Sequence, residues 1–189
     1  MSDDRYAISL IRANVISLVL FVPLSVLLLL PHGLLWGWAK TWRDLTLFYE
    51  RQVLFLSLMA AGIIAHEWLH GITWKWLGGN SWKSITFGVN WSALAPYAHC
   101  KEPLAISVYR WGAAAPGLIL GVLPYLAGMV TGYGWFTLFG YLLTITASGD
   151  FIILWLIRKL PGDALVRDHP GKAGCSLVVD SRGQEVSRG

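Results

Sequence analysis

The sequence predicts an all-α integral membrane protein with about four transmembrane helices and a short β-like segment in the loop between the second and third helices. Of the 189 residues, 55% are hydrophobic and only 14% are charged, whereas about 25% of residues are charged in an ordinary soluble domain. Four long apolar stretches and an uneven distribution of Lys and Arg support the same fold class. The composition excludes intrinsic disorder, which needs low hydrophobicity and high charge. The net charge of +4 fits cytoplasmic loops, so we expect no nucleic-acid partner.

The first apolar stretch covers residues 13–30, and its ~18 residues are near the minimum that spans a bilayer. More apolar residues follow Pro31 in place of a small-residue cleavage site, so we expect an uncleaved helix. The other three stretches are each long enough to span a bilayer with some tilt. They cover about residues 53–77, 104–130 and 135–157.

Small residues and tryptophans have structural interpretations in these stretches. Ala113, Gly117 and Gly121 recur at i, i+4 and i+8, which predicts close approach of another helix. Most of the 11 tryptophans lie near predicted helix ends, where we expect them to anchor the protein at the lipid–water interface.

Lys and Arg are concentrated on one side of the predicted membrane. With four spans, both termini share a side with the loop between the second and third helices, and the positive-inside rule makes that side cytoplasmic. We expect residues 1–160 to form one transmembrane domain and residues 161–189 a largely irregular cytoplasmic tail. The cytoplasmic side holds twelve basic residues and the opposite side three, which are Lys40, Arg43 and Arg51.

The loop from Gly78 to Pro103 contains a segment, Ser84–Trp91, that alternates β-branched and aromatic residues. This alternation is typical of a short strand or hairpin. At membrane level such a segment is tolerated only where its backbone is paired or lines a cavity. We expect it to be able to pair with a substrate strand, and Asn90 is a candidate for binding the substrate backbone.

The second stretch contains an H-E-x-x-H motif at His66, Glu67 and His70. Two histidines at i and i+4 lie on one face of a helix and can bind a single Zn²⁺. Glu67 then lies beside the metal and can take a proton from a bound water. The alternative, that the histidines only join helices by hydrogen bonds, explains neither the spacing nor the Glu between them. Of the 11 acidic residues, only Glu67 and Asp150 lie inside predicted spans, where ionisable groups are costly and mark function.

A catalytic zinc site normally has three protein ligands and one open position. Asp150 is the leading third ligand, because at ~1.5 Å per residue it lies ~12 Å from its helix end, and the two histidines lie ~10 to 17 Å from theirs. His99 and the Asp168-His169 pair compete with it, since the loop and the tail can fold back. We expect one zinc ion per chain.

Two loop residues have open roles. His99 is either a donor to a developing oxyanion or an interfacial histidine with a backbone partner. Cys100 is either a soft metal ligand or an apolar filler, and we favour the filler.

The ordered series of motifs resembles the bacterial putative zincin peptidases, a family of small membrane proteins. The resemblance covers about residues 48–174. More distantly, the arrangement of these motifs along the chain is similar to that of site-2-protease-type intramembrane metalloproteases, which place H-E-x-x-H on one spanning helix and an Asp ligand on a later one. That resemblance implies His66, His70 and Asp150 as ligands and Glu67 as general base. The motifs that carry it are residues 66–71, 96–104, 116–117, 148–150 and 168–170.

These observations predict a zinc-dependent metalloprotease embedded in the bacterial cytoplasmic membrane, with its site near the cytoplasmic side. We expect a peptide or membrane-protein substrate; the substrate's identity and the oligomeric state stay open. The alternative is a non-catalytic zinc-containing membrane binding or assembly protein, which a closed four-ligand site that included His99 would favour. A small transporter is a third hypothesis, but no inverted repeat is evident.

Overall fold

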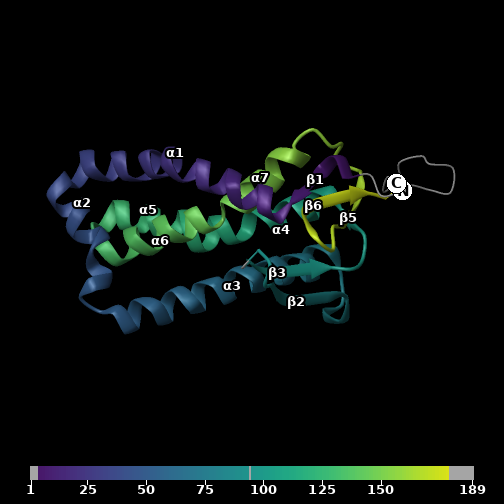
Figure 1. The fold of residues 1–189 in the computed structure, drawn as a ribbon, viewed down its shortest axis with the longest axis horizontal. Coiled ribbons are helices and arrows are strands. Elements are labelled where there is room, and N and C mark those ends of the chain that lie inside the picture. The colour runs from purple at the N-terminus through teal and green to yellow at the C-terminus, as the bar shows by residue number, and fades with distance from the viewer. Residues whose placement is uncertain (1–3, 94, 179–189) are drawn as a thin grey trace. The chain divides into compact units, whose positions relative to one another are not determined.

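The computed structural model describes residues 4–93 and 95–178 (Figure 1). The described chain is mostly helical, with two small antiparallel sheets. The helices are α1 (Leu10–Trp36), α2 (Trp38–Leu45), α3 (Gln52–Gly78), α4 (Ile106–Pro116), α5 (Leu123–Thr131), α6 (Gly134–Thr146) and α7 (Ser148–Ile157). The strands are β1 (Ala7–Ser9), β2 (Ile85–Asn90), β3 (Ala95–Cys100), β4 (Leu104–Ala105), β5 (Leu165–Asp168) and β6 (Lys172–Leu177).

The predicted apolar stretches are helical throughout most of their length. Three helices are long and apolar enough to cross a membrane, and a fourth span results if α6 and α7 count as one. The third span is continuous from Ile106 to Thr131, because a π-helical segment joins α4 to α5. The fourth is bent by 47° between α6 and α7, where Ser148 and Gly149 form the kind of small-residue pair at which helices kink. The bend puts Asp150 in the first turn of α7.

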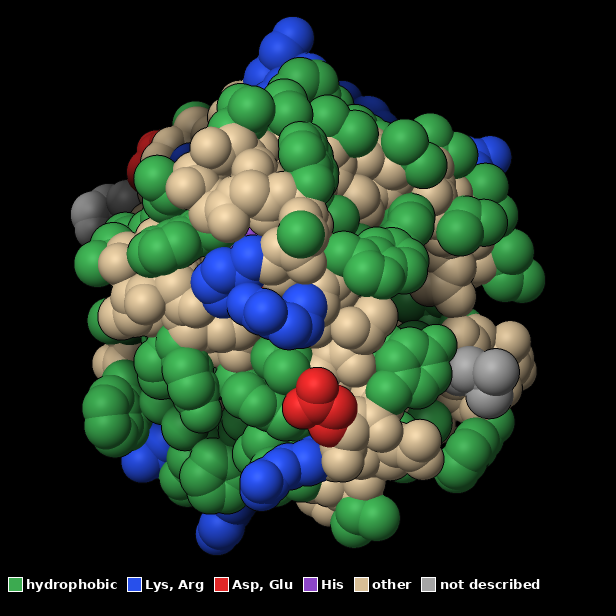
Figure 2. Space-filling model, turned by 90° about the vertical axis from the view of Figure 1, so that its left-hand side faces the viewer, with side chains coloured by type: hydrophobic (Ala, Val, Ile, Leu, Met, Phe, Trp, Pro, Cys, Tyr) green, Lys and Arg blue, Asp and Glu red, His purple; other side chains and the backbone are tan. Residues whose placement is uncertain are grey.

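The exposed surface of the long helices is strongly apolar. Only 11% of the apolar window of α1, and 11% of that of α3, is buried within the described protein. Hydrophobic side chains are also spread over much of the face drawn in Figure 2, with a few Lys and Arg side chains among them. Apolar area on this scale is far larger than soluble monomers expose, which agrees with the predicted membrane spans.

The chain divides into two compact units. Among the described residues, the sheet unit contains residues 4–15, 67–93, 95–115 and 149–178, and the helical unit contains residues 16–66 and 116–148.

The sheet unit combines strands from distant parts of the sequence. Its larger sheet has the order β1-β6-β5-β4, so the segment after residue 160, which we expected to be largely irregular, contains two strands. Each strand is only two to six residues long, too short to leave a clear periodic signal. The predicted hairpin is confirmed: β2 and β3 pair antiparallel, from Ile85 with Cys100 to Asn90 with Ala95.

In the helical unit, α5 and α6 lie side by side (Figure 1). Glycines make this close contact possible, because a Cβ on Gly128 would lie 2.5 Å from the backbone nitrogen of Thr137. A Cβ on Gly121 would likewise lie 2.5 Å from the Thr144 hydroxyl. The predicted role of Gly121 in close packing is therefore confirmed.

Gly140→Ala is expected to destabilise the helical unit. Its new Cβ would overlap the backbone nitrogen of Tyr125 on α5, so the two helices would have to separate, at a cost of about 1–3 kcal/mol. Chemical unfolding in detergent measures the change. Gly162→Ala is the control, because no atom lies within 4 Å of a Cβ there. Equal stability of the two variants would contradict the packing.

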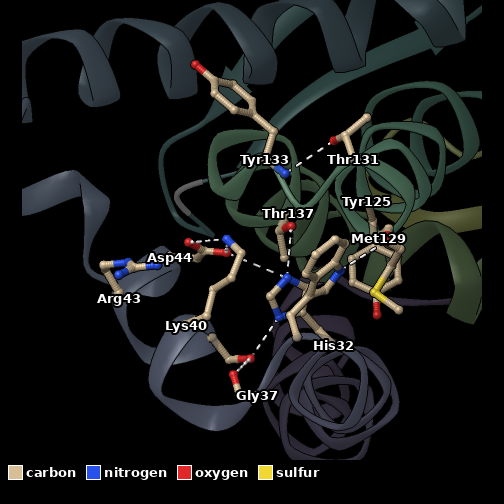
Figure 3. Close-up of polar contacts among 12 residues, drawn as sticks. His32, Gly37, Lys40, Arg43, Asp44, Tyr125, Met129, Thr131, Tyr133 and Thr137 are labelled. Atoms are coloured by element: carbon tan, nitrogen blue, oxygen red, sulfur yellow. Dashed lines mark hydrogen bonds and ion pairs between the residues drawn. The ribbon is translucent and has the colours of Figure 1, made fainter.

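Helix α2 was not predicted from the sequence. It has eight residues, and two of its polar side chains, Thr41 and Asp44, are buried. Its partner is His32 of α1 (Figure 3), which is fully buried. The His32 Nδ1 lies 2.8 Å from the Thr41 hydroxyl, and its Nε2 lies 3.3 Å from the Thr137 hydroxyl. Asp44 lies 3.6 Å from the same Nε2 and forms an ion pair with Lys40 at 2.9 Å. This buried polar cluster fixes α2 to α1 and α6, whereas the apolar side chains of Trp38 and Trp42 stay exposed.

Candidate metal centre

The H-E-x-x-H motif lies in the second half of α3, on one continuous helix. His66, Glu67 and His70 each offer one ligand atom, and these atoms all lie within 4.8 Å of one another. Helix geometry brings the two histidines together, because residues four apart in a helix lie one above the other on the same face. Both histidines are buried and Glu67 is half-buried. Within residues 4–93 and 95–178, no other group of three His, Cys, Asp or Glu residues meets this geometry.

The His70 ring has a defined orientation. Its Nδ1 lies 2.8 Å from the carbonyl oxygen of Gly112 on α4. A carbonyl can only accept a hydrogen bond, so Nδ1 carries a proton, and in the neutral imidazole Nε2 then has the free lone pair. Metal-binding histidines are typically fixed in this way, with the second ring nitrogen donating to a carbonyl or carboxylate. His70 therefore has the tautomer that a metal ligand needs.

Asp150 lies beside the same ring. Its Oδ1 is 3.4 Å from the Nε2 of His70, and its side chain is largely buried. Ligand bonds of about 2.0–2.2 Å at a tetrahedral angle would place a nitrogen and an oxygen about 3.3–3.5 Å apart. The separation of these two atoms, and their chemistry, fit two ligands of one zinc ion. Asp150 is not part of the group formed by His66, Glu67 and His70, whose ligand atoms all lie within 4.8 Å of one another. The role of Asp150 as a ligand stays a prediction.

The β2–β3 hairpin rests on α3 next to the motif. A Cβ on Gly71 would lie 2.6 Å from the Phe87 ring and 3.3 Å from Ile85, so the glycine after His70 leaves room for the hairpin. Gly71 is seven residues before the end of α3, or about 10 Å along the helix. The hairpin therefore runs beside α3 at the level of the motif.

Asn90 lies at the turn end of β2, opposite Ala95. Its side-chain oxygen accepts a hydrogen bond of 3.1 Å from the Ala93 N–H. Asn side chains commonly stabilise turns in this way. The structure thus gives Asn90 a local role in the hairpin turn, and its predicted role in substrate binding stays a prediction.

The structure pairs His99 with Asp168, two of the competing ligand candidates. The His99 Nδ1 lies 2.8 Å from the Asp168 Oδ2, which also accepts a hydrogen bond of 3.3 Å from the Cys100 N–H. The other oxygen, Oδ1, accepts one of 2.8 Å from the Tyr109 hydroxyl. The expected partner of His99 was a substrate oxyanion or a backbone group, and the partner found is a carboxylate. These residues lie far apart in the sequence, so no spacing could have revealed the cluster. A catalytic role for His99 stays a prediction.

Both cysteines are free and fully buried. Burial raises the pKa of the Cys100 thiol. Burial and the nearby Asp168 carboxylate raise the pKa of Cys175 to about 12. Since the thiolate is the form that binds metals, these environments favour the interpretation of Cys100 as an apolar filler.

We expect the Cys175 thiol to resist alkylation in the folded protein. A pKa raised from 9.0 to about 12 lowers the thiolate fraction at pH 8 by about 1000-fold. Because burial and Asp168 disfavour the thiolate, the fold loses stability as the pH rises from 9 to about 12, whereas below pH 9 this group has no such effect. Iodoacetamide labelling followed by mass spectrometry measures the reactivity. Equal labelling rates in folded and denatured protein at pH 8 would contradict this environment.

Comparison with known proteins agrees with this site. A family model described as "Putative zincin peptidase" matches residues 59–165, which is more than half of the chain. The "Uncharacterized 24.7 kDa protein in gap 5'region" of Pyrococcus woesei is 31% identical over 147 residues. The alignment covers 74% of this chain and 64% of the relative, just under two thirds of the relative's length. No solved structure matches.

Proposed function

Since this chain belongs to the putative zincin peptidase family, we propose that it is a membrane-embedded zinc-dependent metalloprotease. One observation carries the proposal: the ligand atoms of His66, Glu67 and His70 converge within 4.8 Å on an apolar helix. A spanning helix keeps three ionisable groups together only at a high cost. A metal site accounts for that cost, because both imidazoles would hold a zinc ion and the carboxylate would remain beside it.

Three side chains would hold one zinc ion: His66, His70 and Asp150. The Gly112 carbonyl supports this assignment by fixing the tautomer of His70, and Asp150 supports it by its distance of 3.4 Å from His70. When bound, zinc supplies a Lewis acid that makes water acidic near neutral pH and polarises a carbonyl oxygen.

Glu67 supplies the proton transfers. As a carboxylate it accepts a proton from the water that attacks the peptide carbonyl carbon. It then returns that proton to the nitrogen of the leaving amine as the C–N bond breaks. A half-buried position within the cluster suits this role, because the group must reach both the water and the leaving amine.

The hairpin is the proposed binding element for the substrate. Among the described residues, β2 pairs only with β3, so its other edge can accept an extended peptide by strand addition. A peptide paired there would lie beside α3, because Phe87 and Ile85 pack against Gly71. We propose that the substrate is an extended segment of a peptide or membrane protein, reached from the cytoplasmic side.

Metal removal tests the proposed activity. We expect the purified protein to hydrolyse members of a peptide library, to lose this activity after treatment with a zinc chelator, and to regain it with one equivalent of Zn²⁺. Mass spectrometry of the products measures the cleavage, and zinc without protein is the control. A protein that binds one zinc ion and cleaves neither peptides nor co-reconstituted membrane proteins would instead support the non-catalytic zinc-binding alternative.

A further inference from the structure

His70 is held from two sides by residues outside the H-E-x-x-H motif. Its Nδ1 donates to the Gly112 carbonyl, and its ring stacks on Trp74, with ring centroids 5.6 Å apart and ring planes 21° apart. Trp74 lies one turn after His70 on the same face of α3. The plane of the imidazole therefore depends on where the indole lies.

Packing alone determines the position of Trp74. The side chain is 4% exposed, and its indole N–H has no hydrogen-bond partner among the described residues. A Cβ on Gly112 would overlap the indole, so one side of Trp74 lies directly against the α4 backbone. Tyr109 stacks on it with ring centroids 6.1 Å apart and planes only 7° apart. The indole is thus fixed by residues of α4.

Asp168 fixes the far end of this stack. The Tyr109 hydroxyl donates to its Oδ1 at 2.8 Å, and both residues are buried. Asp168 itself cannot turn freely, because its Oδ2 accepts hydrogen bonds from His99 and from the Cys100 N–H. A carboxylate held by three donors, two from the end of β3 and one from α4, is a rigid anchor for the tyrosine ring.

We propose that Asp168 and Tyr109 are positioning residues for His70. Asp168 holds the Tyr109 ring, the ring holds Trp74, and Trp74 holds the imidazole in the plane in which its Nε2 faces Asp150. Neither residue contacts the metal or the substrate in this role. The role depends on the proposed function of His70 as a zinc ligand, and it makes zinc affinity sensitive to a residue of strand β5.

Tyr109→Phe is the primary test, because it removes one hydroxyl group and keeps the ring. We expect the affinity of the full-length, detergent-solubilised protein for Zn²⁺ to fall by about 10-fold or more, as when partners that orient a metal ligand are removed. Competition with a chromophoric chelator measures this affinity. Tyr125→Phe is the matched control: its hydroxyl also donates to a buried acceptor, the Leu28 carbonyl, but in the helical unit. It should keep wild-type zinc affinity.

A double variant tests the route through the tyrosine. If Asp168 acts through the Tyr109 hydroxyl, Tyr109→Phe combined with Asp168→Ala should bind zinc no more weakly than Asp168→Ala alone. If the fold-losses of zinc affinity in the two single variants multiplied in the double variant, the two residues would act independently, which would contradict the proposed route. The visible absorption of the Co²⁺-loaded proteins gives a second readout, because it follows ligand geometry. We expect a changed spectrum in Tyr109→Phe and an unchanged one in Tyr125→Phe.

The outcomes separate this inference from the proposed function. The positioning role would be overturned, with the metal site left intact, if Tyr109→Phe and Asp168→Ala both kept wild-type zinc affinity while His70→Ala lost its zinc. Retention of zinc by His70→Ala would overturn the proposed function itself.

Discussion

Glu67→Gln is expected to keep its zinc and to lose peptide hydrolysis. Gln has nearly the same shape as Glu, so the turn of α3 that carries both histidines should be unchanged. A neutral amide cannot accept the proton of the attacking water, and the loss of a general base typically lowers turnover by about 10²–10⁴-fold. Zinc content by elemental analysis and cleavage rate on the same preparation measure the two effects.

The matched control for this variant is Glu50→Gln, an exposed acidic residue outside the motif. It makes the same chemical change and should keep both zinc and activity. Full activity in Glu67→Gln would contradict the assignment of Glu67 as general base, and loss of zinc from it would show that Glu67 is a ligand.

His66→Ala, His70→Ala and Asp150→Ala are each expected to lose zinc. Each variant removes one of three proposed ligands, and two remaining ligands hold zinc far more weakly. We expect zinc content to fall from about one ion per chain to near zero after gel filtration, with the loss of all hydrolysis. Elemental analysis of each purified variant measures the content.

His169→Ala is the control for the ligand series. His169 is a competing candidate in sequence, and the structure gives its Nδ1 a hydrogen bond from the Gly171 N–H at 3.1 Å. It should keep its zinc. If Asp150→Ala kept its zinc and His169→Ala lost it, we would assign the third ligand to the segment after β5 instead.

The long helices and the motif were predictable because their signals are local. Helix α3 needed only an apolar stretch of sufficient length, and the His66–His70 spacing fixes one helical face whatever the rest of the fold does. Asp150 required one further assumption, that residues at equal depth in a bilayer can meet. The contact between Asp150 and His70, at 3.4 Å, agrees with that depth argument.

The features that could not be predicted from the sequence depend on contacts between distant segments. The sheet formed by β1, β6, β5 and β4 joins strands of two to six residues, and pairing of this kind leaves no periodic pattern. Helix α2 was missed because Thr41 and Asp44 turn polar groups inward, against the usual pattern. The Asp168–Tyr109 contact was not visible because nearly sixty residues separate the two.

The central claim is a zinc site built from two histidines and one aspartate, and X-ray absorption at the zinc edge of the purified protein tests it most directly. We expect about one zinc ion per chain, with only nitrogen and oxygen neighbours at about 2.0–2.2 Å and the scattering pattern of two imidazoles. Absence of zinc after purification with added Zn²⁺, or a sulfur neighbour at about 2.3 Å, would contradict it.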